Sequence, residues 1–506
     1  MALNPVGIGC VSGPRRRGPL VLAAAATLVV LYAGLNKALL FRNLEYFESD
    51  LFGFLEMSWS WHYAGRLLHD NAYGDHFAIH NYYLLPLLAP LTISLGAYGL
   101  IVVLVVFHLL AIWRVACTAA LDFPGRLAAL AGLLGPIAYY VFDNPVWGFH
   151  PEILYPPLVA LLAVELLEGR TGRAIAVVLL IVFVKEDGAV LVAAVLVAYF
   201  AGRLWSLRAG AREERRTVIR AALLSLLAMT LVFLVGIAVL SLAGQSIAPS
   251  QTASSPRLLK ALRILAATLT GDARPLQRTR LLEGLTAYAG TMALVLLPLG
   301  RRLPRGLILA GLSAPPVIVV LAVSSAIYRF ELMAWPPRLA LLVGLLVACI
   351  VFAWSSPTRP AFARTAAGVV VLIGVSWGLQ VLLLRHIGYS PWPRLDTMAL
   401  LRGDAYRAST LPPRELEFLR CVAGRLPSGL PVLAPRDVIP VFHRQSVVFE
   451  ELMVHAWHPP RLRVVLSTAA ATEGGTCRGP QAGSLAVEAE CSLLPLVRGC
   501  GRDADP

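Results

Sequence analysis

Long apolar stretches separated by short polar loops recur along most of the chain. Most are long enough, or nearly so, to cross a hydrocarbon layer of about 30 Å as helices. Backbone polar groups in lipid must be satisfied within the segment, so the pattern predicts an all-α polytopic membrane bundle of about 11 segments. The segments are predicted at residues 19–41, 82–113, 128–143, 152–167, 174–184, 188–201, 221–243, 283–299, 307–327, 337–354 and 365–384.

A charged run interrupts the apolar pattern in the middle of this region. Residues 174–184 and 188–201 are each too short to span alone, and Lys185, Glu186 and Asp187 separate them. This predicts two short helices that meet at or below the outer surface. Charged, non-helical backbone at that depth requires surrounding protein or a watery cavity.

The pattern changes after residue 384. A helical stretch at 412–426 precedes short β-like runs, which predicts a small α/β domain. The β-like runs are 431–434, 438–442, 446–450 and 461–467. The sequence therefore predicts three parts. They are an inner segment, 1–18, a transmembrane domain, 19–384, and an extracytoplasmic domain, 385–506. The transmembrane domain includes two long outer loops, 42–81 and 244–282.

Basic loops predict the orientation of the chain. With the N-terminus inside, the short basic loops after every second segment fall on the inner side, as the positive-inside rule requires. The odd number of segments then puts the C-terminus outside a bacterial cytoplasmic membrane. Since these loops account for much of the net charge of +14, we expect membrane lipids and no nucleic acid as partners.

The cysteine positions agree with this orientation. Cys421, Cys477, Cys491 and Cys500 all lie in the predicted outer domain, where disulfides persist. Four cysteines allow three pairings, and the sequence does not choose among them. Four free thiols are the alternative.

Ionisable residues gather at the predicted outer ends of the segments. The candidate catalytic residues are Asp50, Glu56 and Glu152, and the candidate binding residues are His76, His80, His150, Lys185, Glu186, Asp187, Arg257, Lys260 and Arg263. Sugar transfer from a lipid phosphate needs a carboxylate base and a cation that neutralises the leaving phosphate. This set of side chains offers both.

Each candidate also has a structural explanation. Asp50 could cap a helix that begins near Phe52, and the two histidines of 76–80 could make interfacial hydrogen bonds or bind zinc. The charged run 185–187 could be an internally satisfied ion pair. The basic stripe lies on a predicted amphipathic helix, 256–270, which could rest on anionic headgroups.

Four short motifs in series resemble the domain-of-unknown-function 2079 family of predicted prokaryotic membrane proteins. They are Asp50-Leu-Phe, His76-Phe-Ala-Ile-His, Phe149-His-Pro-Glu and Val184-Lys-Glu-Asp. That family is similar in layout to the GT-C glycosyltransferase superfamily. The resemblance implies polyprenyl-phosphate sugars as donors and an acidic base in the first outer loop.

By that resemblance Asp50 takes the position of the base, and Asp143 or Glu152 is the nearest candidate for a second acidic residue. The family pattern has a second acidic residue shortly after this aspartate. In this chain the corresponding residue is Glu56, which comes one position later than in the pattern. We therefore expect a GT-C-like glycosyltransferase acting at the outer face, with a divalent cation left open as cofactor. The alternatives are a transporter or flippase, and a non-catalytic membrane scaffold.

Overall fold

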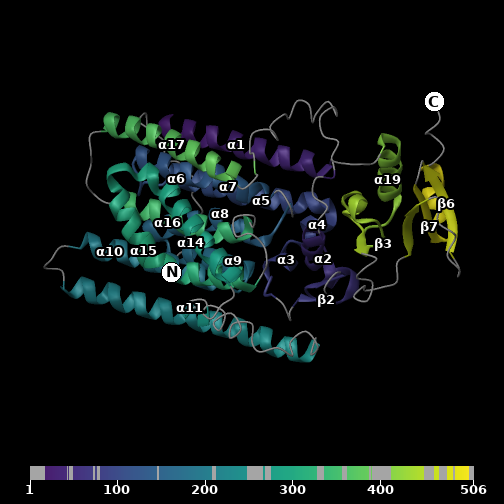
Figure 1. Ribbon diagram of the computed structural model, residues 1–506, viewed down its shortest axis with the longest axis horizontal. Helices are drawn as coiled ribbons and strands as arrows, with labels where there is room; N and C mark the ends of the chain where they lie inside the picture. The colour runs from purple at the N-terminus through teal and green to yellow at the C-terminus, as the bar shows by residue number, and fades with distance from the viewer. Residues whose placement is uncertain are drawn as a thin grey trace, which may run out of the picture.

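The structure is a computed structural model with two parts, a long helix bundle and a small sheet domain at one end of it (Figure 1). The residues that it describes are 17–42, 44, 49–71, 74–76, 80–144, 148–207, 212–247, 266–267, 270, 275–327, 336–355, 362–386, 389, 412–448, 461–466, 476–482 and 485–500.

The bundle is built from helices that run back and forth along its length. In chain order they are α1 (Arg17–Arg42), α2 (Ser49–Ala64), α3 (Leu84–Leu87), α4 (Ala89–Leu95), α5 (Ala97–Cys117), α6 (Phe123–Leu134), α7 (Pro136–Asp143), η3 (Pro151–Leu154), α8 (Tyr155–Leu167), α9 (Thr171–Val184), α10 (Gly188–Ser206), α11 (Arg212–Ile247), α14 (Pro275–Leu296), η4 (Leu297–Arg302), α15 (Leu303–Ile327), α16 (Pro336–Trp354) and α17 (Phe362–His386). A two-stranded hairpin, β1 (His69–Asp70) with β2 (Gly74–Asp75), follows α2.

Within the described residues, seven helical stretches are long and apolar enough to cross a membrane, or eight if the bent pair α6–α7 is one span. The predicted count of about eleven is therefore not confirmed. Helices α8 and α9 have only 13 and 14 residues, too few to span alone. The stretch 284–321 counts once, although Gly300, with φ 53°, divides it into two helices that pack together.

Helix α16 forms the centre of the bundle. All of its apolar window is buried, and it packs against α6, α8, α10 and α15. An apolar helix enclosed on every side needs no polar face. By contrast, none of the apolar window of α11 is buried, and this helix lies along one side of the bundle (Figure 1).

The bend between α6 and α7 lies at Gly135 and Pro136. A Cβ at Gly135 would come within 2.8 Å of the Ala131 carbonyl oxygen, so the packing requires glycine here. The broken helix frees backbone groups, and α17 satisfies them. Gln380 accepts from the Ile137 amide at 3.1 Å, and the Trp377 indole donates to the Ala131 carbonyl at 3.3 Å. Such repair makes a bend tolerable at membrane depth.

The C-terminal domain is a mixed sheet with short helices. Its elements are α19 (Pro413–Arg425), β3 (Pro431–Leu433), η7 (Arg436–Phe442), β4 (Ser446–Val448), β5 (Leu462–Leu466), β6 (Thr476–Ala482), β7 (Leu485–Glu490), α20 (Leu494–Val497) and η9 (Arg498–Cys500). The strand order is β4-β3-β5-β7-β6, with β3 parallel to both neighbours and the other pairs antiparallel. Disulfides join Cys421 to Cys500 and Cys477 to Cys491.

The predicted helix and the runs beginning at 431, 446 and 461 correspond to α19, β3, β4 and β5, and one predicted run does not form a strand. Residues 438–442 were expected as a strand, and they form the 3-10 helix η7 instead. Pro440 lies inside this segment and lacks the amide hydrogen that a strand ladder uses. Strands β6 and β7 were not predicted.

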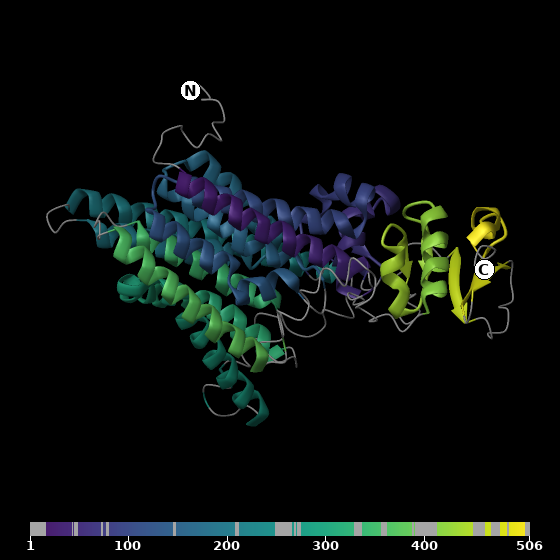
Figure 2. The same cartoon turned by 90° about the horizontal axis from the view of Figure 1, so that it is seen from above.

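The C-terminal domain contacts the bundle at the end that carries α2, α3 and α4, and both views show it there (Figures 1 and 2). Asn71 donates to Ser446 at 2.6 Å, and Arg420 donates to the carbonyl of Arg42 at 2.7 Å. Gly96 has φ 59°, and a Cβ there would lie 2.1 Å from His443 Nδ1. Close backbone approach therefore sets one contact between the two parts.

Candidate functional site

The break between α9 and α10 carries the charged run 185–187. Lys185 leaves the helical conformation, with φ −170° and ψ 165°. At Gly188 a Cβ would come within 2.2 Å of the Ile181 carbonyl oxygen, so the start of α10 packs directly on the end of α9. The predicted break is thus present, but α10 extends to Ser206 and, with 19 residues, is long enough to span.

Glu152, from the third motif, lies beside this break. It lies in η3 and is 3% exposed, and Lys185 Nζ donates to its Oε1 at 2.6 Å. His150 Nδ1 contacts the other carboxylate oxygen, so both oxygens have partners. Lys185 Nζ also lies 3.9 Å from Asp187 Oδ2. One ammonium group therefore serves two carboxylates.

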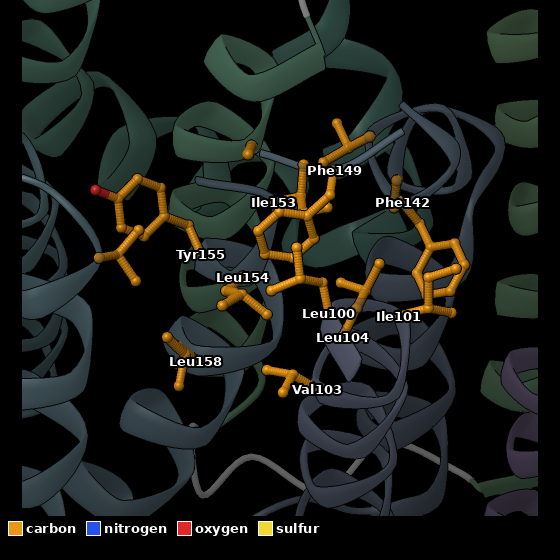
Figure 3. Close-up of a cluster of buried hydrophobic side chains, with 14 of the residues drawn as sticks. Leu100, Ile101, Val103, Leu104, Phe142, Phe149, Ile153, Leu154, Tyr155 and Leu158 are labelled. Carbon is orange, nitrogen blue, oxygen red and sulfur yellow. The ribbon is translucent and has the colours of Figure 1, made fainter. Parts of the chain in front are cut away.

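Asp187 is also tied to the apolar core through Tyr155, whose hydroxyl donates to Asp187 Oδ1. The Tyr155 ring lies beside a cluster of buried apolar side chains from α5, α7, η3 and α8, and its hydroxyl points away from them (Figure 3). Leu100, Phe149 and Leu158 belong to this cluster and are fully buried. A packed apolar wall thus fixes the polar groups from one side.

Glu186 faces the opposite side of the break and contacts the loop before α3. His80 Nδ1 lies 2.7 Å from Glu186 Oε1, and the Asn81 amide donates to Oε2 at 3.1 Å. Burial, followed by the nearby charge of Lys185, lowers the pKa of His80 from 6.5 to about 4, although Glu186 opposes this shift. At neutral pH His80 is therefore uncharged.

The Tyr82 ring lies at the centre of these groups. Its centroid is 5.2 Å from those of Phe54 and His80, and Lys185 Nζ lies 5.9 Å from it. Burial raises the pKa of Tyr82 well above its usual value, and the charges of several carboxylates raise it further. These carboxylates are Glu152, Glu186, Asp50 and Asp187.

Asp50 is therefore within electrostatic range of the Tyr82 hydroxyl, together with the other three carboxylates. It lies in the first turn of α2, which begins at Ser49, and it is partly buried. The alternative of an N-cap for a helix starting near Phe52 does not fit this boundary. A carboxylate in the first turn still interacts favourably with the helix dipole.

The structure brings seven of the predicted residues together. We define the charged cluster as Asp50, His80, His150, Glu152, Lys185, Glu186 and Asp187. The cluster contains four carboxyl groups and one ammonium group; Lys185 contacts Glu152 and Asp187, and the two histidines contact carboxylates. Such a carboxylate-rich site can accept protons and bind cationic or hydroxyl groups.

Two predicted residues have partners elsewhere. Glu56 is 3% exposed, and Asn71 donates to it from its backbone amide at 2.8 Å and from its side chain at 2.9 Å. The Ser446 hydroxyl lies 3.5 Å from the same carboxylate, so Glu56 links α2 to the C-terminal domain. His76 is paired with the fully buried Asp70 of the hairpin.

The basic stripe of Arg257, Lys260 and Arg263 lies outside the described residues, and its predicted role stays a prediction. No group of three or more His, Cys, Asp or Glu side chains able to hold a metal occurs in the described ranges. The divalent cation considered from the sequence likewise stays a prediction.

Sequence reasoning missed a buried lysine in the first span. Lys37 is 1% exposed, lies in α1 and donates to the carbonyl oxygen of Asp143. The Asp143 carboxylate accepts from the Tyr389 hydroxyl at 2.8 Å. A charge inside an apolar stretch was the available signal, because intramembrane ionisable residues are functional candidates by default. Asp143 thus has partners outside the charged cluster.

The comparisons agree with the resemblance seen in the motifs. Residues 43–403 match the family described as predicted membrane protein (DUF2079), which covers most of the chain and all the residues of the charged cluster. The chain belongs to this family. No curated protein and no solved structure matches it.

Proposed function

We propose that the protein is a GT-C-like glycosyltransferase that moves a sugar from a polyprenyl-phosphate donor to an acceptor at the outer face of a bacterial cytoplasmic membrane. The observation that carries the proposal is the imbalance of the charged cluster. Asp50, Glu152, Glu186 and Asp187 all act on the Tyr82 hydroxyl, and Lys185, the one ammonium group of the cluster, contacts two of them. A structural ion pair would need only one carboxylate for this lysine.

Each half of the transfer has a candidate group in the cluster. Asp50 is the proposed base, since it acts on the Tyr82 hydroxyl together with the other three carboxylates, and a positioned carboxylate can take up the proton of the acceptor. Lys185 is the proposed partner of the donor phosphate. An ammonium group has three N–H donors, and Glu152 accepts one of them at 2.6 Å. The lysine is 15% exposed, which leaves a side open to a ligand.

The experiment is a transfer assay on membranes that contain the protein, with a panel of radiolabelled polyprenyl-phosphate sugars. The expected result is label in an acceptor fraction with at least one donor. A flippase would instead carry the lipid-linked label across the bilayer without cleaving it, and a scaffold would do neither. If every donor is either carried across without cleavage or left unchanged, the proposal of a glycosyltransferase is contradicted.

The proposed site also requires that the C-terminal domain and the charged cluster face outside. The positions of the basic loops and the disulfides of the C-terminal domain support this orientation. Reporter fusions after Leu384 and within residues 202–220 test it. A reporter that is active only outside should work at the first position, and activity at the second position contradicts the orientation.

A further inference from the structure

A cavity of about 250 Å³ lies between the bundle and the C-terminal domain. The end of α1 contributes Phe41 and Arg42, and the start of α5 contributes Tyr98. The opposite wall belongs to the C-terminal domain, with Arg420 of α19 and the segment 440–445. None of these residues belongs to the charged cluster, so this cavity is a separate place in the molecule.

One wall of the cavity is a preformed set of aromatic rings. Phe41, Tyr98 and His443 contact one another edge to face, with centroid distances of 5.2 to 5.4 Å. Burial, together with the charge of Arg444, lowers the pKa of His443 from 6.5 to about 4. The ring is therefore neutral at neutral pH, and the wall presents no charge of its own.

The other walls are strongly basic. Arg42, Arg420 and Arg444 line the cavity, and no ion pair found within the described residues involves any of them. Burial lowers the pKa of Arg420, and the charge of Arg42 lowers it further, which means that the two guanidinium groups repel each other. The nearby Glu417 opposes this shift only in part.

The level of the cavity in the membrane narrows the choice of ligand. Arg42 is the last residue of α1, and Tyr98 is the second residue of α5. Both helices are long and apolar enough to span a membrane. The cavity thus lies where two spans leave the apolar layer. Its volume is below the roughly 300–1,000 Å³ of pockets for drug-sized molecules, so a headgroup fits better than a larger ligand.

We propose that this junction cavity binds a phosphate group, with Arg42, Arg420 and Arg444 as its ligands and the aromatic wall against the carbon attached to it. Guanidinium groups suit this role because their fork of N–H donors matches phosphate oxygens. A bound anion also relieves the repulsion between Arg42 and Arg420 and joins the bundle to the C-terminal domain. The proposal does not depend on the transfer reaction.

The test measures binding to the full-length protein in detergent and phosphate-free buffer. One probe is dihexanoyl phosphatidic acid, which carries its phosphate on a lipid, and the other is inorganic phosphate. The variants are Arg420→Gln and Arg42→Gln, with Arg414→Gln as the matched control, because Arg414 is an exposed arginine of the same helix α19. The Arg42 variant keeps the backbone carbonyl that Arg420 uses, so docking of the two parts survives it.

Both cavity variants should weaken binding about tenfold or more, as expected for a lost charge-assisted hydrogen bond, and the control should not. Binding of the lipid that inorganic phosphate cannot displace identifies a lipid phosphate as the source. Displacement at similar concentrations identifies free phosphate. The proposal is overturned if neither probe binds, if both cavity variants bind normally, or if Arg414→Gln weakens binding equally. Because no turnover is measured, a failed transfer assay leaves this result unaffected.

Discussion

At the end of the bundle where α5, α8, α10 and α16 terminate, two arginines bond to groups close to them. Arg114 bonds to Glu165 at 2.8 Å and to Glu168 at 2.7 Å, and Arg302 donates to the Trp354 carbonyl at 2.7 Å. At the opposite end, the charged cluster contains four carboxyl groups and one ammonium group, which contacts two of them. The first arrangement closes helix ends, whereas the second has more carboxyl groups than cations to pair with them.

The difference shows which charges are candidates for chemistry. Buried charges are costly unless paired, so a balanced pair can be explained by structure alone. A buried cluster with more carboxyl groups than cations carries a cost that an ion pair does not explain. Ionisable groups with shifted pKa values concentrate at functional sites, so such a cluster is a candidate for chemistry. The predictions below test whether the two ends really differ in this way.

The largest effect is expected for Asp50→Asn. Loss of a general base typically lowers the rate by about 10²–10⁴-fold, because an amide cannot accept a proton at neutral pH. The fold should survive, since the amide is nearly isosteric with the carboxylate. Initial rates with the active donor from the panel provide the measurement. Glu165→Gln at the arginine-rich end is the control and should keep its rate; near-normal turnover in Asp50→Asn would move the base to Glu152 or another acidic residue.

The next largest effect is expected for Glu152→Gln, measured as thermal stability in detergent. The substitution removes the 2.6 Å partner of the buried Lys185 and leaves Asp187 at 3.9 Å, and breaking a buried pair in this way typically costs about 3–5 kcal/mol. Glu165→Gln is the matched change at the other end, where Arg114 retains Glu168 as a partner. We expect that variant to lose only about 1 kcal/mol. Equal losses would mean that the two ends do not differ energetically.

Most of the bundle could be predicted because apolar length is a local property. The break at residues 185–187 was visible for the same reason, since three charges interrupt an apolar run. The region of helix α2 was predicted as an outer loop, with a helix beginning near Phe52 only as an alternative. Its 16 residues are interrupted by Glu56, Ser58 and Ser60, and its burial comes from elements elsewhere in the chain.

The charged cluster could be predicted only in part, because its contacts join distant residues. Lys185 meets Glu152 across 33 positions, and His80 meets Glu186 across 106. Hydropathy identifies such residues singly and cannot pair them. For this reason Glu56 looked as good a candidate as Glu152, although its partners are Asn71 and the C-terminal domain.

A smaller effect is expected from acid. The pKa of His80 is about 4 in the folded chain and near its ordinary 6.5 when unfolded, so the unfolded chain binds more protons between these values. Stability should therefore fall as the pH is lowered from 6.5 to 4. Unfolding temperatures across this range should decline less steeply in His80→Gln. The pKa of His443 is lowered in the same way, so part of the decline in unfolding temperature should remain in His80→Gln. If His80→Gln has the same dependence on pH as the unaltered protein, His80 is not buried as a neutral ring.

The smallest effect is expected for Glu490→Gln, in the C-terminal domain. Arg461 holds this carboxylate with three contacts of 2.8 to 3.0 Å, a fuller set than the single 2.6 Å contact between Lys185 and Glu152. Both side chains are more than 40% exposed, however, so water solvates the charges and screens their attraction. We therefore expect no resolvable change in unfolding temperature, at low or high salt, under the conditions used for Glu152→Gln. A loss as large as that of Glu152→Gln would mean that contact geometry, and not burial, decides what an ion pair contributes here.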